Sequence, residues 1–381
     1  MEKKFEGDIW LIIAMLSLLA LGWIMVFSSS LAYSEAQGLG TLHFAKRQTI
    51  AFLLGGLGFL GATYIQVRFW QKIAPWLLIL SILALIIVLI PGVTRPVNGS
   101  LRWIFIGPFS LQVSEFAKLA FIIYLSDFLV RRKTEVETKV TGLLKPLLIL
   151  SIVSLFLLLE PDFGTIVVMT LTTFGLLFLG GVPFRNFVIL GILSSLVLGL
   201  VLLSSPYRVI RLTTFLNPWD DQYNTGYQLT QSLIAFGRGG WFGEGLGNSI
   251  QKLLYLPEPH TDFLYAILAE ELGLMGALCV LSLFALLIWR IFRVGRNALH
   301  SLPSQAFGGF VAYGIGLWIS AQAMINIGVN VGVLPTKGIT LPLMSYGGNS
   351  VIVLLFGLGL LFRIDFENRL SKRGLWRNDY E

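Results

Sequence analysis

The stretch YLPEPHTDFLYAILAEELG, residues 255–273, places a carboxylate where a proline-bracketed turn runs into an apolar segment. Asp262, preceded by His260 and Thr261, falls at the predicted start of a helix. The positive end of a helix dipole favours an ionised carboxylate there, and Asp is also an ordinary helix cap. An ordinary cap does not require that a rigid Leu-Pro-Glu-Pro-His segment lead into the helix. Helix chemistry alone therefore leaves two roles open, a cap and a functional carboxylate.

Two more carboxylates follow in the same segment. Glu270 and Glu271 come eight and nine residues after Asp262, which is about 12–14 Å along a helix that rises 1.5 Å per residue. Carboxylates at that depth of a membrane are costly and normally face a cavity or a partner. The pattern fits a structural pairing inside the protein and a functional site equally well.

An earlier apolar segment, SEFAKLAFIIYLSDF, carries a second set of charges. Glu115 and Lys118 are three residues apart and so lie on one face of a helix, where they can pair with each other. The pair could be self-neutralised, which would let both side chains enter the membrane. Alternatively, it supplies a cation and a carboxylate to the same cavity as Asp262. Spacing alone does not decide between these roles.

Three polar stretches supply further candidates. PVNGSLRWIFIGPFSLQ (96–112) is typical of an anchoring helix at the membrane surface, with Trp103, Phe105 and Phe109 at headgroup level and Arg102 reaching polar groups. The glycine-dense FGRGGWFGEGLGNS (236–249) lacks the strand–loop–helix context of a nucleotide site but could meet a lipid diphosphate as a flexible basic loop.

The third stretch is GVLPTKGITLPLMSYGGNS (332–350), which brings Lys337, Ser345 and Tyr346 between prolines and glycines. Irregular backbone at membrane depth is tolerated where it lines a cavity. A packed re-entrant turn and a substrate-facing loop would both have this pattern.

The composition indicates the membrane setting of these residues. Of the 381 residues, 55% are hydrophobic and only 13% are charged, against about 25% charged in soluble domains. We predict an all-α polytopic membrane protein of one domain, with a large loop at 205–262. Its ten spans are predicted at about 9–27, 49–66, 73–91, 110–130, 145–160, 163–181, 186–204, 263–292, 305–328 and 349–363.

The basic residues predict the orientation. Of the 28 Lys and Arg residues, 18 lie in one set of connections, which includes both termini, and nine lie in the other. The positive-inside rule then puts both termini in the cytoplasm, and the 205–262 loop and the candidate site on the outer face. The net charge of +7 is explained by this topology rather than by nucleic acid. A single cysteine and three scattered histidines argue against a disulfide framework, a thiolate cluster or a multi-histidine zinc site.

Several long motifs carry a family resemblance. NPWDDQYNTGYQLTQSLIAFGRGGWFGEGLGNSIQKLLYLPEPHTDFLYAILAEELG resembles the signature of the SEDS proteins (shape, elongation, division and sporulation), as do VNGSLRWIFIGPFSLQVSEFAKL and LPTKGITLPLMSYGGNS. The likeness spans nearly the whole chain. Asn349 departs from a motif that more often reads Ser-Tyr-Gly-Gly-Ser-Ser. The sequences NSIQKLLYLPEPHTDF and LGWIMVFSSS resemble the division branch of this family more closely than its elongation branch.

The resemblance implies a GT-C-like peptidoglycan glycosyltransferase that polymerises lipid II outside the bacterial cytoplasmic membrane. It also implies a class B penicillin-binding protein as transpeptidase partner, within the membrane machinery of division or elongation. The family's essential aspartate falls on Asp262, and its paired acidic and basic residues fall on Glu115 and Lys118. No organic cofactor is expected.

Lipid II chemistry then suggests roles for the candidates. Asp262 could deprotonate the acceptor 4-hydroxyl or hold a divalent cation, Mg²⁺ or Mn²⁺. Positive charge is needed near the departing diphosphate. The candidates for binding substrate are Lys118 with Glu115, Arg102, Arg238, Lys337 and Ser345, and the supporting candidates are His260, Thr261, Glu270, Glu271, Tyr227 and Gln228.

Two other classes of function also fit the pattern. A lipid II flippase would use many spans, intramembrane charges and a basic outer cavity, although the short inner loops offer no evident anion pocket. A non-catalytic scaffold of the cell-wall synthesis complex would use the aromatic-rich outer loops to recruit a partner. Loss of the Asp262 carboxylate would abolish catalysis, whereas neither alternative requires that chemistry.

Overall fold

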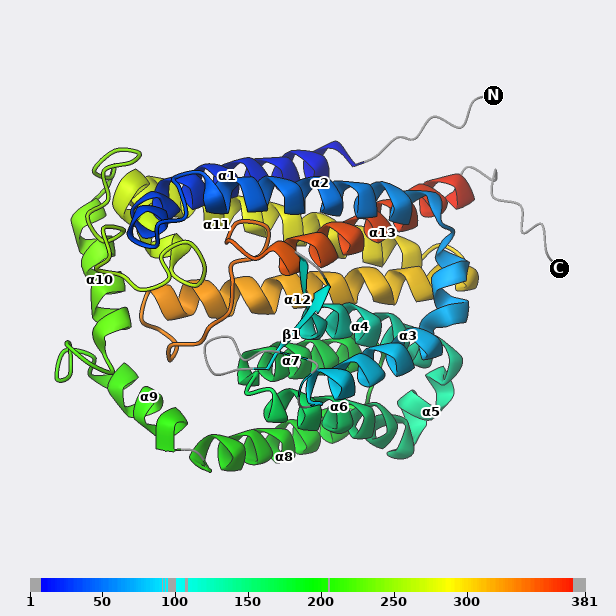
Figure 1. Cartoon of the computed structure of the whole chain (residues 1–381). Helices are drawn as coiled ribbons and strands as arrows, with labels where there is room; N and C mark the ends of the chain where they lie inside the picture. The colour runs from blue at the N-terminus through cyan, green and yellow to red at the C-terminus, as the bar shows by residue number, and fades with distance from the viewer. Residues whose placement is uncertain are drawn as a thin grey trace, which may run out of the picture.

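The computed structural model describes residues 8–90, 92, 94, 101–106, 109–204 and 206–372, which form a bundle of long helices (Figure 1). One small antiparallel hairpin interrupts it, pairing Trp103 with Gln112 and Ile106 with Phe109. The elements are α1 (Ile9–Ala36), α2 (His43–Tyr64), α3 (Val67–Val88), β1 (Trp103–Ile106), β2 (Phe109–Gln112), α4 (Val113–Arg131), α5 (Lys133–Thr138), α6 (Thr141–Leu159), α7 (Phe163–Leu179), α8 (Phe184–Leu203), α9 (Pro206–Leu216), α10 (Tyr227–Gly239), α11 (Leu264–Leu299), η1 (Pro303–Gln305), α12 (Ala306–Asn330) and α13 (Gly348–Lys372).

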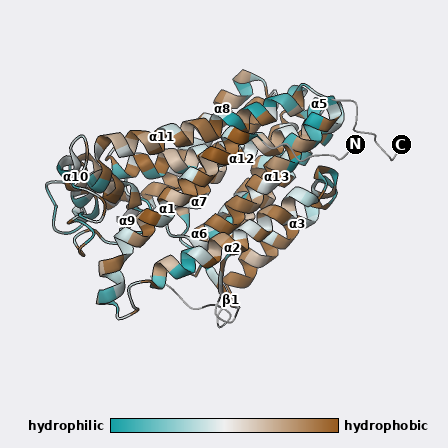
Figure 2. Cartoon of the chain, turned by 90° about the horizontal axis from the view of Figure 1, so that it is seen from above, coloured by the Kyte–Doolittle hydropathy of each residue, from teal (hydrophilic) through white to brown (hydrophobic). Residues whose placement is uncertain are grey.

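The expected polytopic all-α architecture is confirmed, and each of the ten expected spans falls on a helix. Within the described residues, seven helices are long and apolar enough to cross a membrane by length and composition. The other three expected spans are α2, α4 and the 17-residue α7. Most of each long helix consists of hydrophobic residues (Figure 2).

Several boundaries differ from the sequence prediction. In the described part of 96–112, which leaves out 96–100, 107 and 108, a hairpin stands in place of the expected anchoring helix. Trp103–Ile106 and Phe109–Gln112 satisfy their backbone groups by pairing with each other. The hairpin also takes the first residues of the span expected at 110–130. The helices α1, α11 and α13 extend beyond their expected spans by roughly two turns or more. The apolar pattern used to predict a span ends where polar residues begin, whereas the helix itself continues through them.

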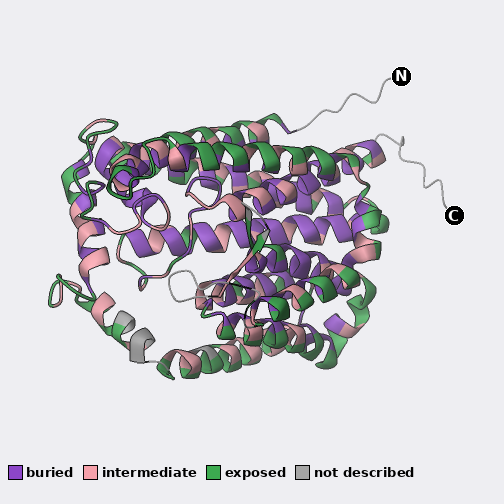
Figure 3. Cartoon of the chain, in the orientation of Figure 1, coloured by how far each residue is buried: buried purple, intermediate pink, exposed green. Residues whose placement is uncertain are grey.

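The core of the bundle lies around α12 and α13 (Figure 3). α12 packs against α4, α7 and α11, and α13 packs along α2. By contrast, no described residue in the apolar window of α8 is buried, and α8 lies at the margin of the bundle. The helices that hold the polar side chains of the site are thus the best-packed ones.

The long helix α11 is broken at Gly273, where φ is +68° and ψ is −170°. The glycine-rich loop fills the break: the amides of Glu244 and Gly245 donate to the carbonyls of Glu270 and Glu271 at 3.0 Å. On the other side of the break, the Leu274 amide donates to the Gly240 carbonyl at 2.9 Å. These bonds replace intrahelical ones that a membrane would leave unsatisfied. The loop is therefore hydrogen-bonded into the bundle. The prediction of a flexible basic loop at 236–249 is wrong.

The same loop and the residues that follow it neutralise the two deep glutamates. Glu270 accepts hydrogen bonds from Arg238 Nε (3.0 Å), from the amides of Ile250 and Gln251, and from the Ser249 hydroxyl. Glu271 pairs with Lys252 at 2.7 Å and accepts from Ser28 on α1. Both glutamates are fully buried. Of the two roles left open for them, the structure favours pairing within the protein.

Replacing Gly273 with alanine should destabilise the protein. A Cβ at this position would lie 2.4 Å from the Gly243 amide nitrogen, and the positive φ is itself unfavourable for an L side chain. The conformational strain alone corresponds to about 1–3 kcal/mol of unfolding free energy. We expect a lower unfolding temperature for Gly273→Ala in detergent. Gly61→Ala is the control, because a Cβ on Gly61 in α2 meets no atom within 4 Å; equal unfolding temperatures for the two variants would show that the break in α11 tolerates a side chain.

Candidate functional site

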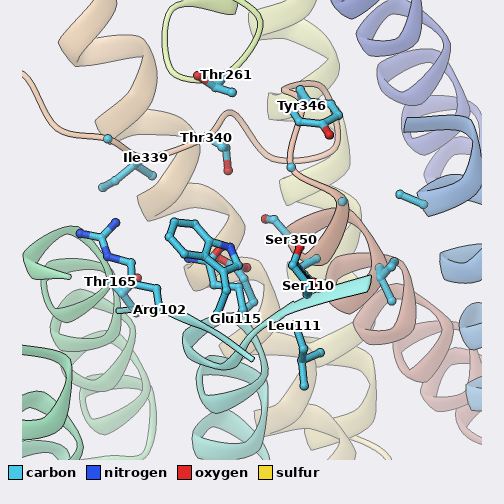
Figure 4. Close-up of a pocket in the computed structure, with 18 of the residues that line it drawn as sticks. Arg102, Ser110, Leu111, Glu115, Thr165, Thr261, Ile339, Thr340, Tyr346 and Ser350 are labelled. Carbon is cyan, nitrogen blue, oxygen red and sulfur yellow. Dashed lines mark hydrogen bonds between the residues drawn. The ribbon is translucent and has the colours of Figure 1, made fainter. Parts of the chain in front are cut away.

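A cavity of about 960 Å³ lies among the hairpin, α2, α4, α7, α12, α13 and the two loops that precede α11 and α13 (Figure 4). Five of the catalytic, substrate-binding and supporting candidates line it: Arg102, Glu115, Lys118, Thr261 and Asp262. They come from the hairpin, from α4 and from the loop before α11. The whole lining extends from Arg47 to Ile352, so the cavity joins segments from nearly the full length of the chain.

The α4 pair lies at one wall of the cavity. Lys118 Nζ donates to Glu115 Oε1 at 2.8 Å and to Gln322 Oε1 at 3.2 Å, and it lies 4.9 Å from the centre of the Trp318 ring. Both charged side chains are almost fully buried. Glu115 Oε2 has no partner within the described protein. The pair is therefore neutral as a whole while one buried acceptor still lacks a donor, which a bound hydroxyl or amide could provide.

Asp262 lies outside α11 rather than in its first turn. The helix begins at Leu264, its cap position is Phe263, and no side chain caps it. Of the two roles left open for Asp262, the structure excludes the ordinary N-cap. The Asp262 side chain lines the cavity instead, and its Oδ2 atom would lie only 3.1 Å from a Cβ placed on Gly338. A side chain at position 338 would therefore have to displace this carboxylate by a few tenths of an ångström.

Arg102 reaches the cavity from the base of the hairpin. Its Nε and Nη2 atoms donate to the backbone carbonyls of Glu160 and Pro161, at 3.2 and 2.6 Å. These bonds tie the hairpin to the turn between α6 and α7. Asn349, the residue that departs from the family motif, ties the other strand by donating to the Ser110 carbonyl at 2.7 Å. Together they hold the hairpin over the cavity.

Other candidates lie away from the lining. Arg238 is engaged with Glu270, as described above. Lys337 Nζ lies 4.0 Å from the centre of the Phe163 ring, and the buried Ser345 hydroxyl accepts from the Leu341 amide at 3.0 Å. The candidates outside the cavity lining are Arg238, Lys337, Ser345, His260, Glu270, Glu271, Tyr227 and Gln228, the last two being half-buried at the start of α10.

His260 is a buried packing residue. Its ring contacts Phe44, Tyr33 and Tyr346, with centroid distances of 4.3, 5.1 and 5.6 Å, and its carbonyl accepts from the Tyr346 amide at 2.8 Å. Burial lowers the pKa of His260 from 6.5 to about 4. The ring is therefore neutral near pH 7 and joins the two loops of the site through aromatic contacts.

The structure adds lining residues that sequence reasoning did not select, notably Arg47, Asp162, Glu258, Gln322 and Thr340. Glu258 is the most unusual of these. Its φ is +52°, which is uncommon for a residue with a side chain. The following Pro259 makes this conformation less favourable still, because a residue before proline prefers an extended backbone. The Thr261 hydroxyl donates to the Glu258 carbonyl and carboxylate. Its place in the Leu-Pro-Glu-Pro-His-Thr-Asp turn was the signal available in the sequence.

The charges of the cavity suit a ligand with both anionic and hydroxyl groups. Three basic side chains line it (Arg47, Arg102 and Lys118), and so do four carboxylates (Glu115, Asp162, Glu258 and Asp262). Among the described residues, no group of three or more His, Cys, Asp or Glu side chains is placed to hold a metal ion. Carboxylate oxygens such as those of Asp262 are of the type that Mg²⁺ takes as ligands, so Asp262 is the candidate that could hold such an ion.

Comparison with known proteins shows a full-length relationship. The family model FTSW_RODA_SPOVE, described as "Cell cycle protein", matches residues 9–370. A protein of Nitrosococcus halophilus is 51% identical over 367 residues, covering 96% of this chain and 94% of its own. One of Legionella pneumophila is 51% identical over 97% of this chain and 93% of its own. Both are named "Probable peptidoglycan glycosyltransferase FtsW".

Solved structures share the fold. A chain from work on "structural coordination of polymerization and crosslinking by a peptidoglycan synthase complex" has a TM-score of 0.79 and 28% identity, covering 95% of this chain and 98% of its own. The rod shape determining protein RodA of Thermus thermophilus has a TM-score of 0.68 and 26% identity, covering 98% of each chain.

Acidification should destabilise the protein through His260. Its pKa in the folded state (about 4) lies below that of the unfolded chain (6.5), so the unfolded state binds more protons between these values. The resulting stability is present above pH 6.5 and is lost as pH falls towards 4, by about 3 kcal/mol. Unfolding temperatures measured in detergent from pH 7 to pH 4 check this.

The comparison variant is His260→Phe, which keeps the aromatic packing without a titratable ring. Its unfolding temperature should fall less over the same pH range. His300→Gln is the control, because His300 is exposed, and it should behave like the wild type. If His260→Phe follows the wild-type pH dependence, the buried ring is not its source.

Proposed function

The chain belongs to the FtsW/RodA/SpoVE family of cell cycle proteins, and we propose that its cavity is the site of peptidoglycan glycosyl transfer. The activity is that of a peptidoglycan glycosyltransferase, as in relatives with about half of their residues identical over nearly the full length. One observation carries the assignment of the site: a single cavity brings together Asp262, the buried Glu115–Lys118 pair and Arg102.

The proposed reaction joins two molecules of lipid II, the undecaprenyl-diphosphate-linked disaccharide peptide. The acceptor 4-hydroxyl oxygen forms a bond to the donor's anomeric carbon, and the bond from that carbon to the diphosphate oxygen breaks. Asp262 is the cavity carboxylate proposed to take the hydroxyl proton. Lys118 and Arg102, with Arg47, supply the positive charge that stabilises the departing diphosphate.

A divalent cation is the alternative partner of Asp262. Mg²⁺ or Mn²⁺ would be held by the Asp262 carboxylate and would supply further positive charge beside the diphosphate. In that case Asp262 binds the ion rather than the proton, and polymerisation depends on added divalent cation. Comparing polymerisation with and without a chelator separates the two roles.

The site is proposed to lie on the outer side of the cytoplasmic membrane. The start of α1 and the end of α13 lie at one end of the bundle, and α10 lies at the other (Figure 1). The excess of Lys and Arg on the side of the chain ends supports a cytoplasmic location for them. The loop that precedes α11 then faces outwards with Asp262.

The proposed protein partner is a class B penicillin-binding protein, which would crosslink the glycan strands, within the division or elongation machinery. The similarity to a chain of a peptidoglycan synthase complex supports this proposal. A transpeptidase next to the cavity would receive strands as they leave it. Copurification with a cognate penicillin-binding protein from membranes tests the association.

Asp262→Asn should reduce polymerisation by roughly 10²–10⁴-fold, because an amide cannot accept the proton or hold the cation with the same charge. The assay adds labelled lipid II to purified protein and its cognate penicillin-binding protein, and separates the glycan strands on a gel. Asp220→Asn is the matched control, since Asp220 is exposed in the same loop region. Wild-type strand synthesis by Asp262→Asn would remove Asp262 from the mechanism. Movement of lipid II across vesicles without strand synthesis by the wild type would favour a transporter.

Gly338→Ala should lower turnover by roughly tenfold without preventing folding. The added Cβ would lie 3.1 Å from Asp262 Oδ2, so the carboxylate must move by a few tenths of an ångström, and displacements of this kind at a reacting group are costly in rate. The same gel assay measures it. Gly56→Ala in α2 is the control, because a Cβ there meets no atom within 4 Å. Equal rates for these two variants would show that a side chain at position 338 does not disturb the Asp262 carboxylate.

A further inference from the structure

The helix α12 carries a row of buried polar side chains that the proposed reaction does not use directly. Trp318, Gln322, Asn326 and Asn330, here called the polar ladder, follow one another at intervals of four residues. This spacing places them on one face of the helix. Each is at most 2% exposed. Amide groups buried in an apolar bundle are unfavourable unless they are hydrogen-bonded, so their partners indicate what they hold in place.

One end of the polar ladder holds the cation of α4. Gln322 Oε1 accepts from Lys118 Nζ at 3.2 Å and from Trp318 Nε1 at 2.8 Å. Its Nε2 atom donates to the carbonyl of Thr340 at 3.0 Å. One amide therefore fixes Lys118 relative to the 336–341 loop. The same loop contains Gly338, which lies next to the Asp262 carboxylate.

The other end holds the main chain of Asp262. Asn326 Nδ2 donates to the Asp262 carbonyl at 2.8 Å and to the Ile339 carbonyl at 2.6 Å. Asn330 Nδ2 donates to the Asp262 carbonyl at 2.9 Å, and its Oδ1 accepts from the Ala266 amide at 3.1 Å. The residue before the helix cap and the first turn of α11 are thus both attached to α12.

We propose that the polar ladder is the positioning device that sets Asp262 and Lys118 at a fixed separation across the cavity. The inference rests on the proposed function for its kinetic consequences. Asn326 and Asn330 do not line the cavity, so they act through Asp262. Gln322 acts through Lys118. α12 packs against both α4 and α11, so one rigid helix carries both sets of contacts.

The two ends of the polar ladder should therefore affect different kinetic parameters. Asp262 takes part in the chemical step, so releasing its carbonyl from α12 should lower kcat with little change in KM. Lys118 contacts the diphosphate in the bound substrate as well as in the transition state, so loosening it should raise KM. A general loss of packing would not separate the parameters in this way.

The kinetic experiment compares four variants in the lipid II polymerisation assay, at a temperature well below the unfolding of each. Asn326→Leu removes two donors and should lower kcat by roughly 10–100-fold. Gln322→Leu should raise KM by about tenfold. Asn330→Leu removes the second donor to the Asp262 carbonyl and should also lower kcat by roughly tenfold, with little change in KM. Ser320→Ala, whose hydroxyl bonds only within α12 to Gly316, should match the wild type.

A second measurement does not depend on enzyme activity. Hydrogen exchange of the backbone amides of 258–268 reports on this attachment, because the Ala266 amide donates to Asn330 Oδ1 as well as to the Phe263 carbonyl. Exchange in this segment should accelerate at least about tenfold in Asn330→Leu and not in Ser320→Ala, as expected when one buried hydrogen bond is lost. If the wild type made no glycan strands, the proposed function would fail while this result could still stand.

Two kinds of result, one kinetic and one from hydrogen exchange, would overturn the proposal. One is a folded Asn326→Leu with wild-type kcat, or a change of the same parameter by the same factor at both ends. The other is unchanged exchange of 258–268 in Asn330→Leu. Faster exchange together with separate kcat and KM effects would support positioning by the polar ladder.

Discussion

The main-chain carbonyl of Asp262 accepts hydrogen bonds from two asparagines of α12, and the arrangement of the site depends on this attachment. Asp262 lies in a turn, outside the regular bonding of α11. Without these donors from α12, that turn could change its conformation. The amides of Asn326 and Asn330 connect it to the best-packed part of the bundle, so the carboxylate lies at a defined place in the cavity.

The same physical constraint explains the rest of the polar interior. A charge or a backbone group inside an apolar bundle needs a partner within the protein. The break of α11 at Gly273 is satisfied by the 240–245 loop, Glu271 by Lys252, and Lys118 by Glu115 and Gln322. Only some of these polar groups face the cavity. The others stabilise the elements that give the cavity its shape.

The distinction between supporting and reacting polar groups was only partly accessible from the sequence. Spacing correctly predicted that Glu115 and Lys118 share a helix face, and the turn before α11 that the sequence singled out contributes to the cavity lining. Arg238 and Ser345 carry the right chemistry but are engaged elsewhere, one with Glu270 and one with a backbone amide. The hairpin at 103–112 was predicted as a helix because its aromatic residues fit a membrane surface equally well in either conformation.

The sequence by itself determined the membrane class, the approximate spans and the types of charged residue available, because apolar length and local spacing are properties of single segments. Only the tertiary structure decided which of those residues share one cavity. That grouping depends on contacts between α4, α12, the hairpin and two distant loops, and on which buried charges are already paired. Such contacts are set by the packing of the whole bundle, and no single segment encodes them.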